Sequence, residues 1–206
     1  MTADPTRDLL LLIDIQNDFC PGGALAVADG DKVVPVANAL IERFRHVALT
    51  QDWHPAGHAS FASSHADAEP FGQMQAAYGP QTLWPDHCVQ GTDGAAFHPV
   101  LNLTPAELIV RKGFRPELDS YSAFFENDQK TPTGLGGWAQ ERGFGHIVMC
   151  GLATDFCVAW SALDARQLGF DVTVVLEGCR AIDLDGSLDA AIDDMHDAGI
   201  ELIQNL

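Results

Sequence analysis

Basic residues are scarce in this chain. Of its 206 residues, 11 are Lys or Arg and 29 are Asp or Glu, so the formal net charge is −18. Nucleic acids and anionic membrane surfaces are bound through cationic side chains that neutralise phosphate. The composition therefore predicts no nucleic-acid partner and no membrane partner.

Long apolar runs and paired cysteines are also missing. No run approaches the roughly 20 apolar residues of a membrane-spanning helix. Asp4, Arg7 and Asp8 interrupt the first segment, where a secretion signal would be apolar. The five cysteines are odd in number and scattered, unlike the framework of a secreted disulfide-bonded protein. These absences predict a cytoplasmic protein with reduced thiols.

The residues that are present suit one globular core. Hydrophobic residues make up 47% of the chain and charged residues 19%, which is typical of a folded chain rather than a disordered one. A chain of this length can bury one large core but is short for two. We therefore expect a single domain over residues 1–206.

Apolar runs that suit buried strands alternate with helical patterns along the chain. We expect strands at 8–14, 46–50, 107–111, 146–151, 171–176 and 200–203, and helices at 33–45, 135–142, 154–168 and 188–198. Such alternation implies right-handed crossovers and helices on both faces of a parallel sheet. The predicted fold is α/β, a three-layer αβα arrangement with a parallel, Rossmann-like central sheet of about six strands.

A long segment from about residue 51 to 103 interrupts this alternation. It is rich in Gly, Pro, His and Ser and shows no convincing periodic element. Loops of this length are uncommon in compact domains unless they are functional or hold a metal. We therefore expect a metal-binding loop region here.

Four reactive residues lie where predicted strands end. Asp14 ends the first strand, Asp52 follows the second, Lys112 ends the third, and Cys157 follows the fourth after a short turn. In open parallel sheets, ligands bind at the carboxyl ends of the strands. Each residue alone could be a solvated group at a polar strand end, but their common register favours one shared site.

Cys157 is the best candidate for a nucleophile. It lies at the predicted start of a helix, where backbone N–H groups and the helix dipole are expected to lower a thiol pKa and to hold an oxyanion. The alternative is a core cysteine, a role that suits Cys150 better because it lies in an apolar run. Position alone leaves Cys20 and Cys88 open.

Asp52 and His54 are a candidate pair of metal ligands. Residues two apart in extended chain project to the same side, and His87 could complete an open three-ligand site for zinc, iron or manganese. His58 could be a fourth ligand or could hydrogen-bond a ligand. The Asp-x-His pattern alone is weak, because it occurs by chance.

Four aromatic residues flank these candidates: Phe19, Trp53, Trp84 and Tyr121. Any of them could pack against an aromatic substrate, and we take Phe19, Trp84 and Tyr121 as the candidates for binding it. Ordinary packing is the alternative for each of the four.

Seven segments together resemble the nicotinamidase branch of the isochorismatase-like hydrolases, in order and at matching spacing over nearly the whole chain. They are LIDIQNDFCPGGAL (12–25), TQDWHP (50–55), HASF (58–61), WPDHCVQGT (84–92), RKG (111–113), DSYSAF (119–124) and GLATDFCV (151–158). Members of the superfamily without a metal lack the pairing of Asp-x-His with Trp-Pro-x-His-Cys.

The resemblance implies a catalytic triad, a metal site and an oxyanion hole. The implied triad is Asp14, Lys112 and Cys157, the metal ligands are Asp52, His54 and His87, and the oxyanion donors are the N–H groups of Ala153 and Cys157, with a cis Leu152–Ala153 peptide. The implied metal is one divalent transition ion, zinc first, with iron or manganese as alternatives.

The implied reaction is hydrolysis of nicotinamide to nicotinate and ammonia in NAD salvage, with pyrazinamide as a further substrate. The expected partner is thus a small-molecule substrate, and homo-oligomers stay open. An alternative is a related amidase or isochorismatase-like hydrolase acting on another small amide or ether, although vinyl-ether hydrolysis would not need a thiol at Cys157. A third reading, a metal-binding or regulatory protein, would predict the loss of a triad member, and none is lost.

Overall fold

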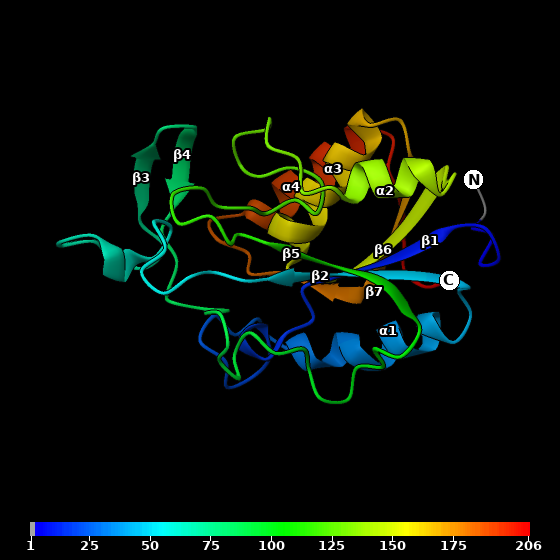
Figure 1. The fold of residues 1–206 in the computed structure, drawn as a ribbon, viewed down its shortest axis with the longest axis horizontal. Helices are drawn as coiled ribbons and strands as arrows, with labels where there is room; N and C mark the ends of the chain where they lie inside the picture. Colours follow the sequence, from blue (N-terminus) through cyan, green and yellow to red (C-terminus); the bar gives the residue numbers. More distant parts are fainter. Residues whose placement is uncertain (1–2) are drawn as a thin grey trace.

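Six parallel strands form the central sheet. The computed structural model describes residues 3–206, and the strand order is β5-β2-β1-β6-β7-β8 (Figure 1). All neighbouring strands in this sheet pair in parallel. The strands are β1 (Leu9–Ile13), β2 (His46–Asp52), β5 (Ala106–Lys112), β6 (His146–Leu152), β7 (Asp171–Arg180) and β8 (Glu201–Ile203). The predicted parallel α/β fold is confirmed.

Helices cover both faces of the sheet, as expected for a three-layer arrangement. Figure 1 shows α1 (Val33–Ile41) on one face and α2 (Leu135–Glu141), α3 (Ala159–Gln167) and α4 (Ser187–Asp197) on the other. Strand β1 reads LLLLI and is completely buried, because helices close off a parallel sheet from water on both sides. Within residues 3–206, no helix has the length and apolar character needed to cross a membrane.

The segment from 51 to 103, which shows no convincing periodic element in the sequence, contains two short strands of its own. Strands β3 (Gln73–Ala76) and β4 (Gly79–Thr82) form an antiparallel hairpin outside the main sheet, at the left of Figure 1. Each strand has four residues, mostly exposed or half-buried. β3 reads QMQA and β4 reads GPQT, and four residues each are too few to give a clear periodic signal in the sequence.

Three further predicted elements differ from their expected bounds by four residues or more. The helix expected at 33–45 ends at Ile41. The helix expected at 154–168 begins as a π-helical turn (Thr154–Val158) and continues as α3. Strand β7 reaches Arg180 instead of ending at 176, and its pairing with β6 shifts register between Met149 and Gly151. Local irregularities of this kind depend on contacts between strands, which periodicity does not report.

Close packing between β1 and β6 requires glycine at position 151. Gly151 has φ +137°, and a Cβ there would lie 2.1 Å from the carbonyl oxygen of Ile13. Gly151→Ala should therefore lower the free energy of unfolding by about 2–3 kcal/mol through overpacking and backbone strain. Denaturant unfolding measures this loss. Gly137→Ala in α2 is the matched control, because a Cβ there meets nothing within 4 Å; a loss equal to that of Gly151→Ala would contradict the explanation.

Candidate active site

The ammonium group of Lys112 lies at the centre of the site. Lys112 ends β5 and is completely buried. Its Nζ lies 2.9 Å from Asp14 Oδ2, 3.2 Å from Asp52 Oδ1 and 3.5 Å from Cys157 Sγ, and it donates a hydrogen bond to the Ser120 carbonyl at 2.8 Å. Burial opposes the charge on Lys112, but the two carboxylates outweigh it and hold its pKa well above the usual value.

Asp14 follows β1 in a left-handed backbone conformation, with φ +46°. Thr50 on β2 donates from Oγ1 to Asp14 Oδ1 at 2.6 Å and accepts from the Asp14 N–H at 3.1 Å. The other carboxylate oxygen, Oδ2, forms the ion pair with Lys112 but accepts no hydrogen bond of good geometry. Complete burial raises the pKa of Asp14, although Lys112 lowers it. This carboxyl group is thus suited to accept a proton.

Cys157 lies in the π-helical turn that leads into α3, and its side chain lines a cleft. The expectation of a lowered thiol pKa is wrong for the chain without metal. Burial raises the pKa of Cys157 well above its usual value, and Asp14 and Asp52 add to this, while only Lys112 lowers it. The desolvation of an anion and two nearby negative charges outweigh the helix start and one cation.

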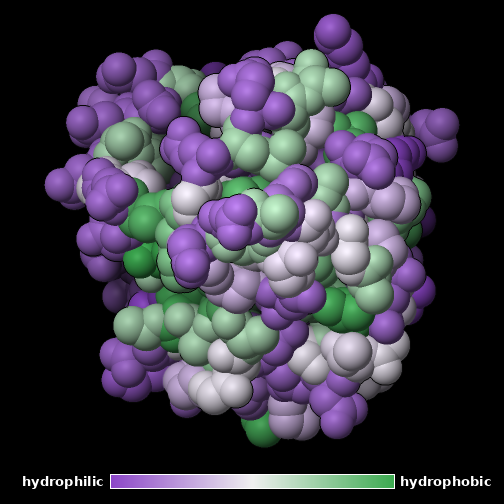
Figure 2. Space-filling view, turned by 90° about the vertical axis from the view of Figure 1, so that its left-hand side faces the viewer, coloured by the Kyte–Doolittle hydropathy of each residue, from purple (hydrophilic) through white to green (hydrophobic). Residues whose placement is uncertain are grey.

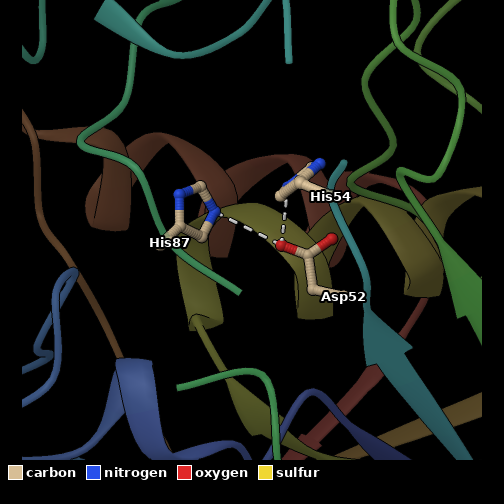
Figure 3. A group of neighbouring side chains, drawn as sticks. All are labelled: Asp52, His54 and His87. Atoms are coloured by element: carbon tan, nitrogen blue, oxygen red, sulfur yellow. Dashed lines mark ion pairs between the residues drawn. The ribbon is translucent and has the colours of Figure 1, made fainter. Parts of the chain in front are cut away.

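Asp52, His54 and His87 converge on one point (Figure 3). Asp52 Oδ2 lies 2.9 Å from His54 Nε2 and 3.3 Å from His87 Nε2. The Nδ1–H of His54 donates to the Gly113 carbonyl at 2.9 Å, and that of His87 donates to the Pro85 carbonyl at 2.8 Å. In the neutral form of both rings Nδ1 carries the proton, so each Nε2 can offer a lone pair to a metal ion beside Asp52. This donor set fits a divalent transition metal.

The backbone around these ligands is held by specific neighbours. Gln16 accepts the Asp52 N–H at Oε1 and donates from Nε2 to the Asp52 carbonyl, both at 2.8 Å. Gly113 has φ +65°, and a Cβ there would lie 2.5 Å from the His54 ring. Burial lowers the pKa of His54, but Asp52 and Asp119 outweigh it and raise the value to about 9 without a metal.

A second group of potential ligands, His54, His58 and Asp119, also lies close together. His58 is not suited to ligate in this arrangement. Its Nε2–H donates to the Arg115 carbonyl at 2.8 Å, so Nδ1 carries the lone pair, which accepts from the Ser60 N–H at 3.1 Å. Both ring nitrogens of His58 are therefore used. Its ring packs against that of His54, with centroids 4.5 Å apart.

The cleft beside these groups is small, with about 330 Å³ of empty space that includes space open to solvent. Its lining includes all three predicted metal ligands, Cys157, Ala153, and the predicted aromatic residues Phe19, Trp84 and Tyr121. The Leu152–Ala153 peptide is cis, as the resemblance implies. Figure 2 shows the side of the molecule that is at the left in Figure 1, where hydrophobic and hydrophilic residues are interspersed.

The aromatic residues divide into two groups. Trp84 and Tyr121 contact Phe156 edge-on, with ring centroids 4.9 and 5.6 Å apart, and all three line the cleft. Trp53 does not line it: the Arg111 guanidinium stacks on its ring at 3.9 Å from the centroid. Trp53, which was not among the three substrate-binding candidates, therefore packs outside the cleft.

Several residues of the site were missed by sequence reasoning. Thr50, Gln16 and Asp119 lie inside the family-like segments, so they carried a signal that was not assigned a role. Phe156 and Ile182 line the cleft without a recognisable polar pattern. Ile182 is placed by Asp155, whose Oδ1 accepts the Ile182 N–H at 3.0 Å, a long-range contact that no local pattern reports.

This fold and this site define an α/β protein of the hydrolase class, with a buried thiol, carboxylate and ammonium group beside a set of metal-binding donors. The sequence model of the isochorismatase domain matches residues 8–205. The chain belongs to the isochorismatase family.

Three known proteins illustrate the relationship. A nicotinamidase of Acinetobacter baylyi is 50% identical over 196 residues, covering 95% of this chain and 92% of that protein. The structure of an Acinetobacter baumanii nicotinamidase and pyrazinamidase is 51% identical with a TM-score of 0.95, covering 96% of each chain. The structure of a Pyrococcus horikoshii pyrazinamidase in complex with zinc is 33% identical with a TM-score of 0.77, covering 96% of this chain and 99% of that one.

The convergence of Asp52, His54 and His87 predicts that the chain binds a metal ion. The chain should bind about one divalent transition-metal ion, and His87→Ala should weaken the affinity for it at least about a hundredfold. Loss of a residue that only hydrogen-bonds a metal ligand already lowers metal affinity about ten- to a hundredfold, and His87 is itself a proposed ligand. Titration calorimetry of metal-stripped protein with Zn²⁺ measures this. His196→Ala is the control, since its side chain is 84% exposed on α4; equal affinities for the two variants would rule out the site.

Proposed function

We propose that this chain is a metal-dependent amidohydrolase that converts nicotinamide to nicotinate and ammonia, a step of NAD salvage, and that it also hydrolyses pyrazinamide. The observation that carries the proposal is one small cleft lined by Cys157 and by the Asp52-His54-His87 set. Lys112 contacts Cys157 Sγ at 3.5 Å and Asp14 at 2.9 Å. The 50% identity to a nicotinamidase supports the choice of substrate.

In the proposed mechanism, Asp14, Lys112 and Cys157 act as a triad. The Cys157 thiol has a raised pKa and is protonated at rest, so an adjacent base must remove its proton. Asp14 Oδ2 has no hydrogen-bond donor aligned with it, and it takes that proton as Sγ attacks the amide carbon. Lys112, 2.9 Å from Asp14 and 3.5 Å from Sγ, stabilises the negative charge on either group.

The remaining steps use the same groups. The N–H groups of Ala153 and Cys157, whose residues line the cleft, hold the oxyanion of the tetrahedral intermediate. Asp14 returns its proton to the departing nitrogen, so ammonia leaves and a thioester of Cys157 forms. Asp14 then takes one proton from water, whose oxygen attacks the thioester, and this proton returns to the Cys157 sulfur as the C–S bond breaks. The acid that leaves keeps the second proton and gives it up in solution, which yields nicotinate.

Asp52, His54 and His87 would hold the metal ion, and zinc is the first choice because a pyrazinamidase relative is in complex with zinc; iron and manganese also suit these ligands. When bound, the ion supplies a Lewis acid that anchors the pyridine nitrogen and orients the ring. Phe19 contacts the His87 ring edge-on, with ring centroids 5.6 Å apart. Phe19 and Trp84 both line the cleft and are proposed to contact the substrate ring there.

We further propose that residues 1–206 act as one domain in the cytoplasm, with a small molecule as the partner. One hydrophobic core spans the strands and the helices that cover them, and ligands from the segment 51–103 complete the site at its edge. All five cysteines are free and buried, which suits a reducing compartment.

Removing the nucleophile should abolish the reaction. Cys157→Ala is expected to lower kcat by several orders of magnitude, because no other group in the cleft can form the thioester. Ammonia release measures this. Cys150→Ala is the matched control: Cys150 is completely buried in β6 and away from the cleft, so most activity should remain. A thioester trapped at another cysteine and detected by mass spectrometry would contradict the mechanism.

Substrate choice tests the anchoring of the ring. Pyrazinamide keeps a nitrogen at the corresponding ring position and should be hydrolysed, whereas benzamide lacks it and should have a kcat/KM about ten- to a hundredfold lower than that of nicotinamide, the cost of an unpaired buried polar group. Comparing the three amides at one metal concentration measures this. Equal values for benzamide and nicotinamide would favour a general aromatic amidase instead.

A further inference from the structure

The hairpin β3–β4 carries one buried side chain, Gln81. Only 2% of Gln81 is exposed, whereas the other residues of both strands are exposed or half-buried. The hairpin does not pair with the six-stranded sheet. A buried amide on a peripheral hairpin needs hydrogen-bond partners, and one of them is the neighbouring Thr82 carbonyl, which accepts from Nε2 at 2.8 Å.

The other partners of Gln81 come mainly from the segment that follows β5. Its Nε2 lies 2.8 Å from Asp119 Oδ2 and 2.9 Å from the Tyr121 hydroxyl oxygen. With the Thr82 carbonyl these are three acceptors for two N–H groups, so one N–H is shared between two acceptors. Its Oε1 accepts from the Tyr78 hydroxyl at 3.0 Å and from Asn127 Nδ2 at 3.1 Å. Because a carboxylate only accepts hydrogen bonds, the amide nitrogen of Gln81 must face Asp119 and its oxygen must face Tyr78 and Asn127.

Tyr121 links Gln81 to the aromatic wall of the cleft. The Tyr121 hydroxyl also accepts the indole N–H of Trp84 at 3.1 Å. Tyr121 and Trp84 both pack edge-on against Phe156, and all three line the cleft. Gln81 therefore contacts the polar end of a wall whose aromatic faces enclose the ligand space.

Asp119 links Gln81 to the metal-binding side of the cleft. Asp119 is 2% exposed, lines the cleft, and has its Oδ1 3.9 Å from His54 Nε2. Its Oδ1 accepts the Ser120 N–H and its Oδ2 accepts Gln81, both at 2.8 Å. Without Gln81, a buried carboxylate oxygen would lose a charge-assisted hydrogen bond, the stronger kind.

We propose that Gln81 is a positioning residue for substrate binding, which sets the aromatic wall and the Asp119 carboxylate around the ring while lying outside the cleft itself. The inference rests on the proposed hydrolysis of nicotinamide. Asp14, Lys112 and Cys157 are held by other contacts, so loss of the Gln81 hydrogen bonds should affect KM much more than kcat.

The test compares two glutamines of the same hairpin. Gln81→Met keeps the length of the side chain but donates no hydrogen bond, and it should raise KM for nicotinamide about tenfold while kcat changes less than about threefold. Gln75→Met is the matched control, because Gln75 is exposed on β3 and should keep wild-type kinetics. An unchanged KM in folded Gln81→Met, or a fall in kcat alone, would overturn the proposal.

Two further variants separate positioning from loss of structure. If Gln81 acts partly through Tyr121, the KM effects of Gln81→Met and Tyr121→Phe should be less than additive in the double variant; full additivity would overturn that route. If Gln81→Met does not fold, Tyr78→Phe removes one donor to Oε1 and should raise KM about twofold to threefold, and a wild-type KM would overturn the proposal.

The outcomes also separate this inference from the proposed function. A wild-type chain that releases no ammonia from nicotinamide after metal loading would overturn both. An active wild type whose KM is matched by Gln81→Met would leave nicotinamide hydrolysis standing and overturn the positioning role alone.

Discussion

A single buried ammonium group organises the site. The transfer of the Lys112 charge out of water costs several kcal/mol, which is offset only if oppositely charged partners and hydrogen-bond acceptors are held in good geometry. Its partners include Asp14 at the end of β1 and Asp52 at the end of β2, and these strands follow β5 in the sheet order. Movement of either strand end would leave a buried charge unpaired, so the constraint that keeps Lys112 charged also fixes a proposed base and a proposed metal ligand.

Charge balance connects this group to the metal-binding donors. Asp14, Asp52 and Lys112 together carry two negative charges and one positive charge when ionised. The raised pKa of His54 lets its protonated ring balance the remaining negative charge beside Asp52. Asp52 faces the Nε2 atoms of two imidazole rings. A divalent cation held there would take the place of the His54 proton, and it would lie beside the cleft that contains the thiol.

The loops around the cleft are held by buried polar side chains rather than by regular structure. Gln16 satisfies both backbone groups of Asp52, and Gln81 joins the hairpin β3–β4 to Asp119 and Tyr121. Loops cannot satisfy their own backbone through ladders, so side-chain amides with two donors and an acceptor take that role. Such buried networks give rigidity to segments that carry ligands, while the sheet supplies their common edge.

The sequence by itself determined the order of the elements and the residues that converge. Apolar runs alternating with helical patterns predict the parallel sheet, because buried strands and amphipathic helices have different periods. The placement of Asp14, Asp52, Lys112 and Cys157 at strand ends predicts their proximity, since parallel strands end at one edge. Tertiary structure alone decided the hairpin β3–β4, the role of His58, the raised pKa of Cys157 and the hydrogen bonds of Gln81 to Asp119 and Tyr121. The hairpin is too short and too polar to show a period. The other three depend on burial or on partners far away in the chain, and neither leaves a local pattern in the sequence.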